Sequence, residues 1–120
     1  MKQYNESMEM YLETIYTLQN SGKTVHAIDI ANELNYSKPS VSRAMKLLVS
    51  NNCITINQQQ DIVLTEEGYN LAKSVYEKHT ILTNFFMSVG ADKALAEENA
   101  CRIEHVITDE LFLIIKNKMN

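Results

Sequence analysis

Three side chains that can bind a metal ion lie close together near the end of the sequence. Cys101, Glu104 and His105 are spaced at i, i+3 and i+4. On a helix these positions are neighbours on one face, so a thiolate, a carboxylate and an imidazole could converge on one ion. They would supply about half of a coordination shell. The remaining ligands must come from other segments.

Two other segments offer such ligands. Met10 and Glu13 are three residues apart near the start of the chain, so they would share one face of a helix. His79 lies between Val75 and Leu82, which would place it along the apolar face of a helix. Taken alone, Met10 is more typical of a core side chain and His79 of a hydrogen-bonded core histidine. The prediction of a metal site therefore depends on all these residues together.

The composition predicts a soluble globular protein of one domain or two small subdomains. No apolar run approaches the length of a membrane span, and the start of the chain does not resemble a signal peptide. We therefore expect a cytoplasmic protein that does not bind membranes. Two distant cysteines, Cys53 and Cys101, are poor evidence for a disulfide. The net charge of -4 argues against indiscriminate nucleic-acid binding but leaves room for a local basic surface.

Hydrophobic periodicity predicts a first helix over residues 6–20 and two short helices within residues 24–49. The turn between the short helices falls at Asn35-Tyr36. Ser37 is a good N-cap for the second of them, and Pro39 lies in its first turn, where a missing N–H is tolerated. The segment 23–49 carries four basic residues and two acidic ones, so it is locally positive in an acidic protein.

The second short helix has two faces with different predicted roles. Its apolar residues are expected to face inward: Val41, Ala44, Met45, Leu47 and Leu48. Its small and basic residues are the candidate DNA contacts: Ser37, Lys38, Pro39, Ser40, Ser42, Arg43 and Lys46. Hydroxyls and helix N–H groups suit phosphate, whereas longer donors such as Arg43 and Lys46 suit base edges in the major groove. The alternative is an ordinary helix pair with a solvated face.

Two short strands are predicted next, at residues 53–56 and 62–65, around a polar loop at 57–61. Three helices followed by a two-stranded wing form a winged helix-turn-helix. The glutamines of the loop could contact sugar or phosphate, or could simply be solvated. Cys53 at the root of the wing is expected to be a small apolar residue.

The rest of the chain is predicted to be helical. Thr65 should cap a long helix that ends at Gly90, and Asp92 should cap the helix that carries Cys101. A last helix, at residues 110–118, is apolar on all sides and must therefore be covered on all sides. In so short a chain this predicts a homodimer. The expected fold is mainly α, with a winged domain at 1–70 and a helical metal-binding and dimerisation domain at 71–120.

Several motifs together resemble one family. They are Glu9-Met10-Tyr11-Leu12, Thr14-Ile15-Tyr16, Ser37 with Pro39, Val41 and Ser42, Leu64-Thr65-Glu66-Glu67-Gly68, Lys78-His79, Ala100-Cys101-Arg102-Ile103-Glu104-His105-Val106, and Asp109-Glu110. Over essentially its whole length the chain resembles the diphtheria toxin repressor and manganese transport regulator family of metal-dependent transcriptional repressors. The Cys-x-x-Glu-His run is the most specific match. The resemblance implies a winged helix domain, a helical dimerisation domain, and a divalent ion bound where the two meet.

The resemblance also implies roles for individual residues. Met10, Cys101, Glu104 and His105 match the primary ligands of the iron-dependent branch. His79 matches a ligand found in both branches, which belongs to an ancillary site in iron-type members, and Glu13 is similar to a ligand of the manganese branch.

Two positions depart from the iron-type pattern. Thr83 stands where those members have Glu, and Glu97 stands where they have His. Either a second ion is absent, or Glu13, His79, Glu97 and Glu104 bind it differently. The chain also ends at Asn120, before the SH3-like third domain of longer members.

Ligand chemistry favours Fe²⁺, because Met10 and Cys101 both offer sulfur. Mn²⁺ is the alternative, and other divalent transition metals could substitute. Since Cys101 and His105 bind metal only when deprotonated, metal binding should weaken in mild acid. The expected function is a metal-activated repressor of metal-uptake genes that binds double-stranded operator DNA as a homodimer and is not an enzyme.

Three other functions stay open. A thiol-based regulator would respond to oxidation of Cys101 or Cys53. A metal-dependent hydrolase could activate water at an open ligand position, although no substrate-binding motif accompanies the ligands. A winged-helix regulator could instead sense an organic molecule with Met10 and His79 as lining, but no such ligand is expected.

Overall fold

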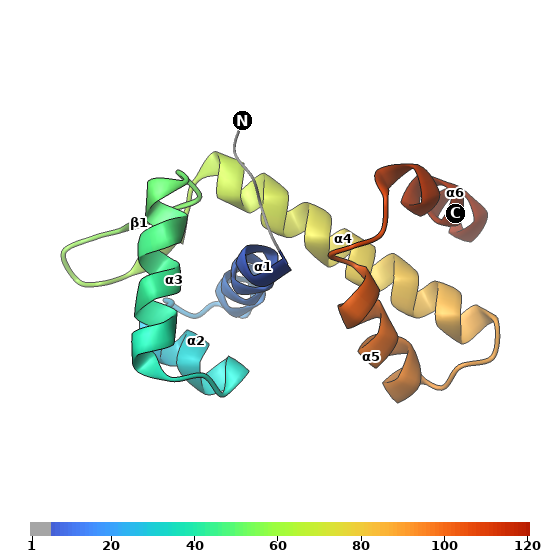
Figure 1. Cartoon of the computed structure of the whole chain (residues 1–120), viewed down its shortest axis with the longest axis horizontal. Coiled ribbons are helices and arrows are strands. Elements are labelled where there is room, and N and C mark those ends of the chain that lie inside the picture. The colour runs from blue at the N-terminus through green and yellow to red at the C-terminus, as the bar shows by residue number, and fades with distance from the viewer. Residues whose placement is uncertain (1–5) are drawn as a thin grey trace. The chain divides into compact units, whose positions relative to one another are not determined.

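The computed structural model describes residues 6–120, which form six helices and one two-stranded sheet (Figure 1). The chain divides into two compact units, the first ending at Lys73 and the second running from Ser74 to Asn120. The boundary falls within helix α4 (Glu66–Ser88), so this helix contributes to both units. Within residues 6–120, no helix combines the length and apolar character needed to cross a lipid bilayer.

The first unit begins with three helices, α1 (Glu6–Asn20), α2 (Ala27–Leu34) and α3 (Lys38–Ser50). Local signals end and begin them. Asn35 closes α2 in the left-handed conformation, with φ 59°, a conformation that asparagine tolerates better than most residues. Ser37 then begins α3, because its hydroxyl accepts a hydrogen bond from the Ser40 backbone N–H at 3.3 Å.

One apolar core joins these helices to the wing. Its fully buried side chains include Leu12, Ile15, Val25, Ile30, Val41, Leu48, Cys53, Ile54 and Ile62. On α3 the buried positions are Val41, Met45 and Leu48, which follow one helical stripe. The prediction that Leu47 faces inward was wrong, because it lies about 120° around the helix from Val41. Leu47 is 48% exposed.

The wing consists of β1 (Ile54–Ile56) and β2 (Ile62–Leu64), paired antiparallel with Thr55 opposite Val63. An isolated bridge from Val25 to Ile62 joins the segment before α2 to the same strand. Cys53 at the root of the wing is fully buried, as expected of a small apolar residue. Helices α1 to α3 followed by this wing confirm the predicted winged helix-turn-helix (Figure 1).

Helix α4 begins against the root of the wing. The Thr65 hydroxyl accepts a hydrogen bond from the Gly68 backbone N–H at 3.0 Å and donates one to the Asn52 carbonyl at 2.7 Å. Gly68 lies so close to the Cys53 backbone that a side chain at this position would collide with the Cys53 carbonyl. In the Thr-x-x-Gly sequence, the threonine thus caps α4 and the glycine lets α4 approach the root of the wing closely.

The second unit contains the C-terminal part of α4, α5 (Lys93–Ile103) and α6 (Asp109–Met119). Asp92 caps α5 by accepting from the Leu95 N–H at 2.8 Å, and Thr108 caps α6 by accepting from the Leu111 N–H at 3.3 Å. The caps at Thr65 and Asp92 agree with the sequence prediction. The last helix begins at Asp109, one residue earlier than predicted.

Helix α6 packs on α4 through one face only. Phe112 is buried, and the ammonium group of Lys78 on α4 lies 5.9 Å from the centre of the Phe112 ring. The same ammonium group pairs with Asp109 at 3.3 Å. A second ion pair, from Lys116 to Glu77 at 3.1 Å, holds the C-terminal part of α6. Three apolar residues of α6 lie open in the single chain: Leu111 is 49%, Leu113 53% and Ile114 61% exposed.

Candidate functional site

Three of the predicted metal ligands meet within the second unit. Glu104 directly follows α5 and is only 1% exposed. Its Oε2 lies 3.0 Å from Nδ1 of His79 on α4, and its Oε1 lies 3.3 Å from Nε2 of His105. Two imidazoles from different segments thus flank one carboxylate.

The burial of this cluster makes its charge state important. The side chain of Glu104 is 0%, that of His105 4% and that of His79 27% exposed. A buried carboxylate is costly unless hydrogen bonds or a cation compensate its charge. The neighbouring imidazoles can do so by carrying protons, and the same nitrogen and oxygen atoms are suitable ligands for a divalent transition metal. The donor set therefore fits a metal ion.

Cys101 has a different environment from Glu104. The helix predicted to carry Cys101, Glu104 and His105 ends at Ile103, and Glu104 is its C-cap. Cys101 is exposed on the last turn of α5, whereas Glu104 is buried. The backbone nevertheless keeps the helical hydrogen-bond pattern up to Glu104, whose N–H donates to the Ala100 carbonyl at 2.9 Å. The helix ends sooner than the periodicity suggested, although no glycine or proline marks the stop.

Met10 and Glu13 lie on α1 in the first unit, and both are half-buried. The Met10 thioether accepts a hydrogen bond from the Tyr36 hydroxyl at 3.8 Å. Tyr36 stands in the turn between α2 and α3, and its ring meets that of Tyr11 edge-on at 6.1 Å between centroids. Burial is the main cause that raises the pKa of Tyr11. Met10 is thus packed against the turn before α3, a contact that the sequence did not reveal.

Thr83 and Glu97 line a cleft of about 460 Å³ in the second unit, together with His79. Thr83 is 8% exposed, and its hydroxyl has no hydrogen-bond partner among residues 6–120. Glu97 is exposed and pairs with Lys93 at 3.9 Å. The cleft brings imidazole, hydroxyl and carboxylate groups to one place, although the carboxylate already has a lysine partner.

The candidate DNA contacts lie at the start of α3 and along its exposed side. Ser37, Lys38, Pro39, Ser42, Arg43 and Lys46 are exposed, and Ser40 is half-buried. The Ser40 hydroxyl oxygen accepts hydrogen bonds from the Ser37 hydroxyl at 2.8 Å and from Arg43 at 3.4 Å. Helix α3 contains three cations and no acidic residue. Its N-terminal N–H groups and these cations suit a phosphate backbone.

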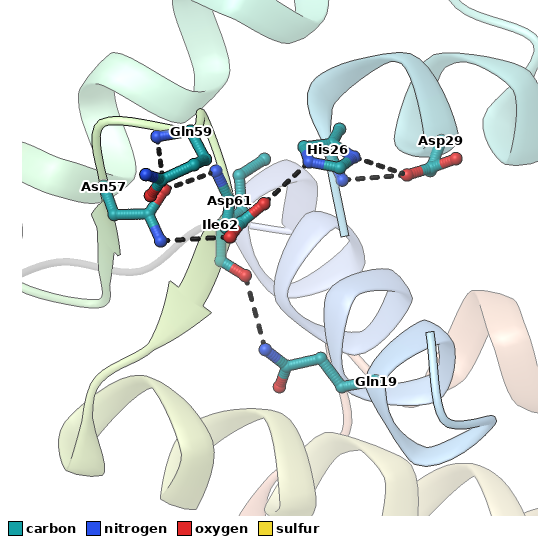
Figure 2. A network of polar contacts seen from close by, with 7 residues as sticks. All are labelled: Gln19, His26, Asp29, Asn57, Gln59, Asp61 and Ile62. Carbon is teal, nitrogen blue, oxygen red and sulfur yellow. Dashed lines mark hydrogen bonds and ion pairs between the residues drawn. The ribbon is translucent and has the colours of Figure 1, made fainter. Parts of the chain in front are cut away.

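One contact within the winged domain was not predicted from the sequence. Nε2 of His26, the residue before α2, lies 2.7 Å from Oδ1 of Asp61, the residue before β2 (Figure 2). The two residues are 35 positions apart, so no local pattern could have paired them. At the helix start itself, the Asp29 carboxylate accepts a hydrogen bond from the His26 backbone N–H at 2.8 Å.

Comparison with known proteins identifies the family of this chain. The family description "Iron dependent repressor, N-terminal DNA binding domain" matches residues 3–58, and "Iron dependent repressor, metal binding and dimerisation domain" matches residues 65–120. The diphtheria toxin repressor of Corynebacterium diphtheriae is 32% identical over 112 residues, which are 92% of this chain and 50% of that protein. An uncharacterised HTH-type transcriptional regulator of Methanocaldococcus jannaschii is 30% identical over 114 residues, covering 93% of this chain and 91% of that protein.

A solved structure agrees with these matches. The manganese regulator SloR is 28% identical to this chain, with a TM-score of 0.83, and the alignment covers 99% of this chain and 55% of SloR. Fold and matches define the class of winged-helix regulators with a separate metal-binding and dimerisation domain. Within that class, the chain belongs to the iron-dependent repressor family, as its motifs predicted. It spans about half the length of the first curated relatives that it matches.

Proposed function

We propose that this chain is a metal-dependent repressor of transcription, in which a bound divalent ion raises the affinity of a homodimer for operator DNA. Membership in the iron-dependent repressor family supports this function. The observation that carries the metal part is Glu104, a buried carboxylate with imidazole nitrogens of His79 and His105 at 3.0 and 3.3 Å. The regulated genes would be those for metal uptake, so we place its work in the cytoplasm.

Glu104, His79 and His105 form the nucleus of the proposed metal site. The family resemblance adds Cys101 from α5 and Met10 and Glu13 from α1 as further ligands. A divalent metal ion in this site would supply a fixed positive charge to compensate the buried carboxylate of Glu104. Metal can activate the repressor only to the extent that it binds the DNA-competent state more tightly than the other state.

We propose Fe²⁺ as the activating ion and Mn²⁺ as the alternative. The sulfur atoms of Met10 and Cys101 favour the softer ion, whereas the cluster around Glu104 contains only nitrogen and oxygen donors and suits either. The cleft lined by His79, Thr83 and Glu97 is where a second ion would bind. The number of ions bound per chain decides whether that site exists.

DNA contact is proposed for the seven residues of α3 and its cap. Ser37, Ser40, Ser42 and the N-terminal N–H groups, with Lys38 and Pro39 alongside, would meet the phosphate backbone. Arg43 and Lys46 would reach base edges in the major groove. The exposed apolar residues of α6 support a homodimer, because a second copy of the chain would remove Leu111 and Ile114 from water. A dimer also matches the two half-sites of a palindromic operator.

The test is an anaerobic titration of the full chain with Fe²⁺ and with Mn²⁺ at fixed salt. DNA affinity is followed on a duplex selected from a random pool by the metal-loaded protein. Metal should raise the affinity, and both His105→Ala and Cys101→Ala should reduce the gain. Metal binding with no change in DNA affinity would leave the ion a structural role and contradict the proposal.

The exposed Cys101 thiol supports a second candidate, a redox-responsive regulator. In that case peroxide, rather than metal, would change DNA affinity. Cys101→Ala would then abolish the response to peroxide and leave the metal titration unchanged.

A further inference from the structure

Asp61 connects the wing to the helix-turn-helix through both of its carboxylate oxygens. Oδ2 accepts a hydrogen bond from the Asn57 side-chain amide at 3.0 Å, within the wing loop. Oδ1 lies 2.7 Å from Nε2 of His26, which stands at the N-cap of α2 (Figure 2). One side chain therefore joins the closed end of the wing to the start of a helix that packs against α3.

The wing loop is held together internally by Asn57. Its Oδ1 accepts hydrogen bonds from the backbone N–H groups of Gln59 at 3.0 Å and Asp61 at 2.9 Å. Backbone bonds from Gln60 to Asn57 and from Asn57 to Asp61 close the turn, and Gln60 adopts φ 65°. The loop is thus a preformed unit whose direction depends on how its base is held.

Three polar contacts hold that base, in addition to the burial of Ile54 and Ile62 in the core. The Ile62 N–H donates to the Val25 carbonyl at 2.8 Å, and the Gln19 side chain donates to the Ile62 carbonyl at 3.3 Å. These two contacts hold the backbone at one residue of β2. The contact from His26 to Asp61 is the third, and it is the one that reaches into the loop network.

Charges around His26 favour the contact. Asp61 faces its Nε2, and Asp29 of α2 lies 3.7 Å from its Nδ1 while accepting a hydrogen bond from the His26 backbone N–H at 2.8 Å. Lys23, in the loop after α1, pairs with the other oxygen of Asp29 at 3.1 Å. Asp29 therefore anchors the His26 backbone, and Asp61 receives the ring.

We infer that His26 and Asp61 are positioning residues that fix the direction of the wing relative to α2 and α3, and so place its exposed glutamines for contact with DNA. This inference rests on the proposed function as a DNA-binding repressor. Gln58, Gln59 and Gln60 are all exposed, and the wing from β1 to β2 has no lysine or arginine. The wing would thus contribute neutral polar contacts to sugar, phosphate or base edges.

This lack of charge gives a distinctive test. Losing a lysine–phosphate contact lowers both affinity and its dependence on salt, because fewer counterions are released. Losing contacts from the neutral wing should lower the affinity alone. We expect His26→Ala to weaken binding to the selected duplex by roughly three- to tenfold, the range for one hydrogen bond. The slope of affinity against salt concentration should stay that of the wild type.

The experiment uses the full, Mn²⁺-loaded chain at pH 8 and three variants, with the selected duplex as the probe. His26→Gln keeps an N–H donor near the position of Nε2 and should restore most of the affinity. Lys23→Ala is the matched control, since it removes an ion pair at the same helix start without touching the wing. Its wing should stay in place, so hydrogen exchange at the N–H groups of Asp61 and Ile62 should equal that of the wild type.

Hydrogen exchange of the free protein tests the wing separately from DNA binding. His26→Ala should speed exchange at the N–H groups of Gln59, Asp61 and Ile62, while exchange in α1 stays unchanged. Unchanged exchange at these wing amides would overturn the inference whether or not the protein binds DNA. Faster exchange with unchanged DNA affinity would overturn the role in DNA contact, as would a His26→Gln variant no better than His26→Ala. Failure of the metal-loaded wild type to bind any duplex would instead count against the proposed function.

Discussion

His79 and Glu104 are 25 residues apart in sequence, yet Nδ1 of the histidine lies 3.0 Å from Oε2 of the buried glutamate. His105 lies beside the other carboxylate oxygen, so imidazole nitrogens flank both oxygens of Glu104. Without metal, the neighbouring imidazoles can compensate the buried carboxylate by carrying protons. A divalent ion would compensate the same charge, so Glu104 is the central residue of the proposed metal site.

Glu104→Gln should remove metal binding while leaving the second unit folded. The amide keeps the size of the side chain but lacks the charge that a divalent ion needs. We expect a loss of Mn²⁺ affinity of about 100-fold or more, beyond what residues outside the ligand shell cost. Isothermal titration would measure it.

Arg43→Ala and Lys46→Ala should each weaken DNA binding and lower the salt dependence. If either side chain contacts phosphate, the slope of log affinity against log salt should fall by about one for each of the two copies in the dimer. If it reads a base edge, discrimination between the selected and a random duplex should fall by about 1–3 kcal/mol. Lys118→Ala on α6 serves as the control. An Arg43→Ala protein that binds like the wild type would make this assignment wrong.

Ile114→Asp should convert a dimer into monomers. Ile114 is 61% exposed in the single chain, so a carboxylate there costs little in the monomer but much in an apolar interface. Sedimentation velocity would report the change. Asn117→Asp adds the same charge at an exposed polar position of α6 and should leave the dimer intact. Equal effects of the two substitutions would place the interface elsewhere.

Leu48→Ala and Leu47→Ala should differ sharply in stability. Leu48 is fully buried, so its truncation leaves a cavity and should lower the free energy of unfolding by about 2–5 kcal/mol. Leu47 is half-exposed, and its truncation should cost about 1 kcal/mol or less. Urea unfolding of the two variants would show whether α3 has the observed rotation.

The loss of folding stability at low pH should depend in part on Asp29 and Asp61. The hydrogen bond from the His26 backbone N–H is the main cause that lowers the pKa of Asp29, and the hydrogen bond from Asn57 is the main cause that lowers the pKa of Asp61. A carboxyl whose pKa is lower in the folded state stabilises it above the unfolded pKa, near 3.9. That stabilisation is lost as the pH falls through the folded value. The free energy of unfolding of Asp29→Asn should therefore fall less than that of the wild type as the pH drops below about 4. Denaturant unfolding at a series of pH values would measure both. If the free energy of unfolding fell equally with pH in both proteins, Asp29 would not be a source of the pH dependence.

Much of the fold was predictable because its signals are local. Ser37, Thr65 and Asp92 each cap a helix within three residues, and the wing follows from alternation around a polar loop. Leu47 was misplaced because it is apolar and directly precedes the buried Leu48, so periodicity alone does not separate the two. Helix α5 ends at Ile103, shortly before the residues 106–109 at which the sequence permits a break.

The candidate metal residues were identifiable by type, but their grouping was not. Spacing placed Cys101 beside Glu104, whereas the fold exposes the thiol and buries the carboxylate between two histidines. The pairing of His26 with Asp61 depends on the packing of the wing against α2, which leaves no trace in a short stretch of sequence. Contacts between distant segments need the folded chain.

The most direct test of the central claim is the affinity of the full chain for Mn²⁺ with and without the selected duplex. If metal raises DNA affinity, linkage requires that DNA raise metal affinity by the same factor. Mn²⁺ should bind more tightly in the presence of the duplex, by a factor equal to the gain in DNA affinity, and Glu104→Gln should show no such gain. A Mn²⁺ affinity that is the same with and without the duplex would contradict it.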